Sequence, residues 1–75
     1  MRLSVVEDDP GYSRESTRYE PLVDGVLVTA LTADEEEGLV VEWLRGPDRK
    51  LMVDARGRPV TVTRTGVRVE LRPVQ

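Results

Sequence analysis

The sequence predicts a mostly β domain, either a small antiparallel sheet sandwich or a partly closed barrel, with one short helical turn. Val supplies 13 of the 75 residues, and β-branched side chains favour the pleated surface of a sheet. Turn-forming groups that contain Gly or Pro divide the chain into short runs, as in all-β domains. A chain of this length makes one domain, so we expect residues 1–75 to fold as a single unit.

The first third of the chain is expected to hold three strands. The first covers residues 2–6, and the polar stretch 12–18 that follows is expected to be irregular or mobile. The second and third strands, 19–23 and 26–31, are joined by Asp24-Gly25. This dipeptide tolerates the positive φ angles of a two-residue hairpin turn, so it gives the strongest hairpin signal in the sequence.

A single helical turn is expected at residues 33–37. Thr32 and Glu35 have the spacing of a capping box, in which each side chain hydrogen-bonds to the backbone amide of the other. Acidic residues in a first turn also suit the helix dipole. Gly38 stands where a left-handed residue would end the turn.

We expect four strands in the second half of the chain, at residues 39–44, 50–54, 59–64 and 67–72. The first of these is apolar on both faces, which is typical of a central strand. The last two are predicted to form a hairpin across Thr65-Gly66, because Val67, Val69 and Leu71 alternate with charged residues.

The predicted core consists of the apolar residues that share one face of these strands. Trp43 is expected to belong to it because its register places it with Leu39 and Val41. The alternative is an exposed Trp43 at an interface, where Trp is enriched. The predicted core residues are Leu3, Val5, Val23, Val26, Val28, Leu39, Val41, Trp43, Leu51, Val53, Val60, Val62, Val67, Val69 and Leu71. Such a core is small, so oligomerisation or docking onto a partner would add stability.

Charge is distributed unevenly along the chain. Residues 1–44 carry three basic and eleven acidic side chains, whereas residues 45–75 carry eight basic and three acidic ones. The simplest interpretation is neutralisation between neighbouring strands, with the acidic run as a solvated turn. Two alternatives stay open: segments 7–9 and 34–37 form one acidic face that mimics a phosphate backbone, or acidic and basic ends of different copies join head to tail. The candidate partner-binding residues are Asp34, Glu35, Glu36 and Glu37.

The composition excludes several classes of function. The sequence has no His and no Cys, which rules out disulfides, imidazole or thiolate metal sites, and Ser-His-Asp or Cys-His catalysis. The acidic run lacks the alternating spacing of a calcium loop, and a domain this small has little room for a substrate pocket. We therefore expect no enzymatic activity, no cofactor and no metal.

Neither a nucleic acid nor a membrane is an expected partner. Direct nucleic-acid binding is disfavoured because the net charge is −3 and the sequence holds only one Trp and two Tyr for base stacking. No apolar run is long enough to span a membrane, and the N-terminal residues lack the apolar region of a signal peptide.

Several motifs, taken in order, resemble small uncharacterised proteins of tailed phages and prophages. These motifs are Asp24-Gly25-Val26, the run LTADEEEGLV at residues 31–40, and GVRVEL at residues 66–71. The resemblance covers residues 19–71, although the loop at 46–49 looks short and Thr65 stands where an aromatic residue often precedes the glycine. It implies a phage accessory or virion-associated protein, and it implies neither an activity nor functional residues.

The expected function is a non-catalytic protein-binding module, an accessory protein of a phage or prophage. One alternative is a small structural, virion-associated protein that acts as an oligomer. Another is an acidic inhibitor or DNA mimic of a host nucleic-acid-binding protein. The expected partner is therefore a protein or a second copy of the chain. The expected location is the host cytoplasm or the virion.

Overall fold

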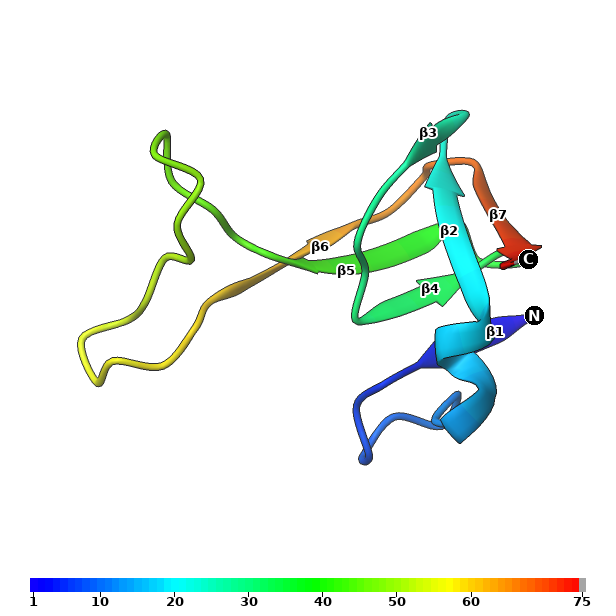
Figure 1. The fold of residues 1–75 in the computed structure, drawn as a ribbon, viewed down its shortest axis with the longest axis horizontal. Coiled ribbons are helices and arrows are strands. Elements are labelled where there is room, and N and C mark those ends of the chain that lie inside the picture. Colours follow the sequence, from blue (N-terminus) through cyan, green and yellow to red (C-terminus); the bar gives the residue numbers. More distant parts are fainter. Residues whose placement is uncertain (75) are drawn as a thin grey trace.

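The computed structural model describes residues 1–74 (Figure 1). A four-stranded antiparallel sheet has the order β1 (Arg2–Ser4), β4 (Thr32–Asp34), β5 (Leu39–Trp43) and β6 (Thr61–Arg64). A three-stranded antiparallel sheet has the order β3 (Val26–Leu27), β2 (Tyr19–Val23) and β7 (Val69–Pro73). The mostly β prediction is confirmed. The two sheets are not closed into a barrel, and the arrangement is that of an open sandwich.

The predicted hairpin at Asp24-Gly25 is confirmed. Strand β2 has the predicted bounds, and both turn residues have positive φ angles, 51° for Asp24 and 84° for Gly25. The returning strand is shorter than predicted, because β3 ends at Leu27 and residues 28–31 cross over to the other sheet.

The prediction that residues 12–18 are irregular was wrong for most of this stretch. Arg14–Arg18 form a 3-10 helix, η1. Ser13 caps it, since its hydroxyl oxygen accepts the backbone N–H of Glu15 at 3.1 Å. A short polar run with a Ser cap is thus enough to order this turn.

The helical turn predicted at residues 33–37 is confirmed only in part, because the Gly38 N–H donates to the Asp34 carbonyl oxygen at 3.0 Å and closes a single turn one residue later than predicted. Thr32 and Ala33 are buried in β4, and a reversal at residues 35–38 leads directly into β5. The cap is Asp34 rather than Thr32: its Oδ1 accepts the N–H groups of Glu36 and Glu37 at 2.9 and 3.0 Å. Gly38 does adopt the expected left-handed conformation, with a φ of +64°.

The hairpin predicted across Thr65-Gly66 does not form. Strand β6 pairs with β5, with Trp43 opposite Thr61, whereas β7 pairs with β2, with Tyr19 opposite Pro73. Residues 65–68 therefore connect the two sheets. The alternation of Val67, Val69 and Leu71 identified a half-buried strand correctly, but alternation carries no information about the partner strand.

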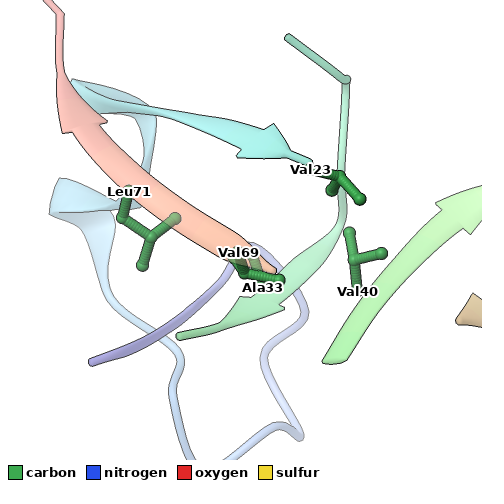
Figure 2. Packing of buried hydrophobic residues seen from close by; sticks show 5 residues of the cluster. All are labelled: Val23, Ala33, Val40, Val69 and Leu71. Atoms are coloured by element: carbon green, nitrogen blue, oxygen red, sulfur yellow. The ribbon is translucent and has the colours of Figure 1, made fainter. Parts of the chain in front are cut away.

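The core lies between the two sheets and draws residues from both (Figure 2). Its buried cluster consists of Val23, Ala33, Val40, Val69 and Leu71. The prediction was right for Val23, Val69 and Leu71. It missed Val40, which is fully buried, because β5 turns this residue inward and leaves Leu39, Val41 and Trp43 half-buried on the opposite face.

Trp43 is thus neither a buried core residue nor a fully exposed one. Leu3, Val28 and Val67 pack against the core from its margin. The core prediction was wrong for Val5, Val26, Leu51, Val53 and Val62, all of which are exposed. The strand predicted at residues 50–54 was wrong as well, since only single bridges form there, at Leu51 and Val53.

Candidate functional site

The structure brings the two acidic segments together through one arginine. The Arg2 guanidinium donates to both carboxylate oxygens of Asp9, at 2.9 and 2.8 Å, and to Asp34 Oδ2 at 3.4 Å. Arg2 lies in the edge strand β1, opposite Asp34 in β4. Segments 7–9 and 34–37 are therefore neighbours in space, with a positive charge between them.

Both carboxylates in this network are held in the ionised form. The hydrogen bond from Arg2 is the main cause that lowers the pKa of Asp9 to about 2. The backbone N–H of Glu37 is the main cause that lowers the pKa of Asp34, with Arg2 contributing. Carboxylates fixed in this way hold a loop and a turn in place and are poorly suited to exchanging protons near neutral pH.

The four predicted partner-binding residues divide into two pairs. Asp34 is buried. Glu35 is half-buried, and its Oε2 accepts the backbone N–H of Leu71 at 3.0 Å, while its Oε1 lies 3.5 Å from the N-terminal amine. Glu36 and Glu37 are exposed at the tip of the turn. Asp34 and Glu35 thus stabilise the fold. Glu36 and Glu37 are the two exposed carboxylates, and they lie 3.7 Å from the N-terminal amine and 3.9 Å from Arg2 respectively.

A second candidate site is a projecting segment that we call the arm, residues 44–60. It connects β5 to β6 and extends away from both sheets, at the far left of Figure 1. Three backbone hydrogen bonds close its base: Leu44 N–H donates to Val60 at 2.8 Å, Met52 N–H to Leu44 at 2.9 Å, and Val60 N–H to Met52 at 3.0 Å. Met52 therefore lies between two small lobes, 45–51 and 53–59.

Each lobe of the arm is organised by one aspartate. Asp54 Oδ1 accepts the N–H groups of Arg56 and Arg58 at 2.8 and 3.0 Å. In the other lobe, Asp48 Oδ1 accepts the N–H of Lys50 at 3.1 Å. These Asx-type turns give the arm a defined backbone without packing it against the body.

The arm displays apolar and basic side chains together. Leu51, Met52 and Val53 at the junction of the lobes are 40%, 45% and 56% exposed. The arm carries five basic and two acidic residues, net +3, whereas the rest of the chain carries six basic and twelve acidic residues, net −6. A contiguous apolar group rimmed by charge, on a segment that contributes nothing to the core, is typical of an interaction surface.

The arm was not among the predicted sites, although its length is a signal that the sequence contains. Residues 44–60 separate two strands that pair with each other, and connections of this length without regular structure are uncommon in compact domains and are usually either functional or linker segments. Recognising the signal required knowing that β5 pairs with β6. The alternation of Leu51 and Val53 was instead interpreted as a buried strand.

Comparison with known proteins does not assign this chain to a family. No protein-family model matches the chain, and neither the curated proteins nor the solved structures contain a significant match.

Within residues 1–74, no three acidic side chains are grouped as metal ligands would be. None of the helical segments in this range has the length and hydropathy needed to cross a membrane.

Proposed function

We propose that this chain is a non-catalytic protein-binding module whose binding element is the arm. The observation that carries the proposal is the exposure of Leu51, Met52 and Val53 on an ordered segment that projects from the body. Exposing three adjacent apolar residues is unfavourable in water, and a partner that covers them recovers this free energy. Their backbone is already fixed, so binding orders few additional residues.

The chemistry of the arm favours a protein partner over a nucleic acid. The arm contains no aromatic residue for base stacking, and the remainder of the chain is net −6. Such a body repels a phosphate backbone, whereas a mixed apolar and basic surface complements an apolar protein patch with acidic neighbours. Residues 19–71 resemble small phage proteins. On this basis we propose that the chain is an accessory or virion-associated protein that acts in the host cytoplasm or on the virion.

The arrangement of ionisable groups supports a non-catalytic role. Asp9 and Asp34, whose pKa values are lowered, are both engaged by Arg2. The bonds that lower these values are the same bonds that hold the fold together, so the perturbation is structural.

A variant without the arm tests the proposal. Leu44 and Val60 are joined by a backbone hydrogen bond at the base, so Asn-Gly can replace residues 45–59 as a two-residue hairpin turn. We expect this variant to keep its fold, measured by amide hydrogen exchange in β5 and β7, and to lose partner binding.

Binding is detected by placing a photo-cross-linking amino acid at Met52, with Val74 as the control position because it is at least as exposed but lies outside the arm. Protein adducts at Met52 and none at Val74 support the proposal. Adducts with nucleic acid, or equal labelling at both positions, contradict it.

A further inference from the structure

The body of the molecule carries an apolar groove whose chemistry matches the arm. The groove has a volume of about 380 Å³ and runs between η1, β2, the end of β3 and the crossover 28–31. Its apolar lining consists of Val5, Tyr19, Pro21, Leu27, Val28 and Ala30. Leu27 and Val5 are 56% and 44% exposed, so the groove presents uncovered apolar surface to solvent.

The body that carries the groove is opposite in charge to the arm. Residues outside the arm carry six basic and twelve acidic side chains, net −6, whereas the arm is net +3. Among the residues that line the groove, Glu20 carries the one charge, and it lies 3.6 Å from Arg72. Within residues 1–74, none of the arm's basic side chains forms an ion pair with a carboxylate. Opposite charge on the arm and on the body steers the association of two copies.

The arm of a given copy does not occupy the groove of that copy. It leaves β5 and β6 in the direction away from η1, β2 and β3, which lie on the body (Figure 1). A single arm–groove contact therefore requires two molecules. A specific interface needs about 800 Å² from each partner, a modest part of the 5614 Å² that the chain exposes.

We propose that the arm of one copy docks in the β2–η1 groove of a second copy, with Leu51, Met52 and Val53 against Leu27 and Val5. This inference rests on the proposed function, because it names the partner that the arm binds. The contact joins two different surfaces, so each molecule offers one arm and one groove. Repetition of the contact gives a closed ring, a reciprocal pair or a chain of copies.

A complementation experiment tests this geometry. One variant carries Leu51→Asp and Val53→Asp in the arm, and the other carries Leu27→Asp in the groove. All three residues are exposed, so the fold should tolerate the changes. A carboxylate placed on either apolar surface would have to lose its water in the contact, so neither variant should bind a second copy of itself. Val74→Asp, at an exposed residue outside both surfaces, is the matched control.

The masses are measured by light scattering on a size-exclusion column. We expect the wild type and Val74→Asp to exceed the monomer mass of 8.4 kDa as concentration rises, and each of the two variants alone to stay at that mass. An equimolar mixture of the arm variant and the groove variant should double the mass, because one intact arm then meets one intact groove. A wild type that stays monomeric, an oligomer that survives both variants, or a mixture that stays monomeric overturns the proposal.

A dilution series of the wild type followed by NMR avoids any question of misfolded variants. Amide resonances of the arm and of residues 27–30 should shift together as the oligomer dissociates, and shifts confined to other residues contradict the docking. If the purified chain is monomeric while Met52 cross-links to another protein, docking on a second copy fails and the proposed protein-binding function stands.

Discussion

The carboxylate of Glu35 accepts the backbone N–H of Leu71, with 3.0 Å between Oε2 and the nitrogen. Glu35 belongs to the turn between β4 and β5, whereas Leu71 lies in β7, an edge strand of the other sheet. One side chain thus joins the two sheets and covers an edge N–H group that would otherwise be free to pair with another strand.

Replacing Glu35 should therefore destabilise the protein more than replacing its neighbour. We expect Glu35→Ala to lower the free energy of unfolding by about 1–3 kcal/mol, the usual effect of losing a hydrogen bond to a charged group. Glu36→Ala, whose side chain is exposed, should change it by less than about 0.5 kcal/mol. Urea denaturation measures both, and the Leu71 amide should lose hydrogen-exchange protection in the first variant only. Equal effects would show that the bond does not join the sheets.

Gly38 combines a left-handed backbone with a close contact. Its φ is +64°, and a Cβ at this position would lie 2.6 Å from the carbonyl oxygen of Val67. Gly66 has a similar φ of +68° but open space around it. Gly66→Ala should cost about 1–2 kcal/mol for the backbone conformation alone, and Gly38→Ala about 1–3 kcal/mol more for the steric clash. Thermal denaturation compares the two variants, and the prediction fails if they melt together.

The network around Arg2 makes the protein sensitive to acid. The pKa of Asp9 falls from 3.8 to about 2 on folding, and that of Asp34 is lowered as well. The unfolded chain therefore binds protons first as the pH falls, so this stabilisation is complete above about pH 4 and is lost as the pH approaches 2. Asp9→Asn should reduce stability at pH 7 and flatten the pH dependence of unfolding in this window. Asp8→Asn, at an exposed neighbour, is the control and should leave the slope unchanged.

The burial of Val40 predicts a strong contrast between two valines. Val40 is fully buried between the sheets, whereas Val26 in β3 is 64% exposed. Val40→Ala should cost about 2–3 kcal/mol through lost burial and the cavity that remains, a large part of the stability of a domain this small. Val26→Ala should cost less than about 0.5 kcal/mol. Denaturant midpoints of both variants check this, and a similar loss at Val26 would contradict the position of the core.

The sequence predicted correctly those elements whose structure depends on residues that are close together in the chain. Strand β2 and its Asp24-Gly25 turn followed from β-propensity and from the positive φ that the turn demands. At the acidic run, either Thr32 or Asp34 could cap the turn that follows. Thr32 and Glu35 have the spacing of a capping box, but Thr32 is a buried residue of β4, paired with β1 and β5. Asp34 therefore caps the turn.

Long-range pairing was beyond the reach of such signals. Val67, Val69 and Leu71 show which face of a strand is buried, but β7 could have paired with β6 as well as with β2. Leu51 and Val53 illustrate the same limit at the candidate site. Their alternation is typical of a half-buried strand, and only the position of β5 and β6 shows that these residues are displayed on the arm.

The pairing of β2 with β7 also determines when this protein can complete its fold. Tyr19 lies opposite Pro73 and Val23 opposite Val69, so the three-stranded sheet joins two strands, β2 and β7, that are far apart in the sequence. On the ribosome, β2 and β3 emerge as an isolated hairpin, which is marginally stable at best in water. The core residues Val69 and Leu71 arrive only with β7. The domain therefore closes in one late step, with the slow kinetics of contacts far apart in sequence. Until then, the edge of β2 that β7 later covers is open to strands from other nascent chains.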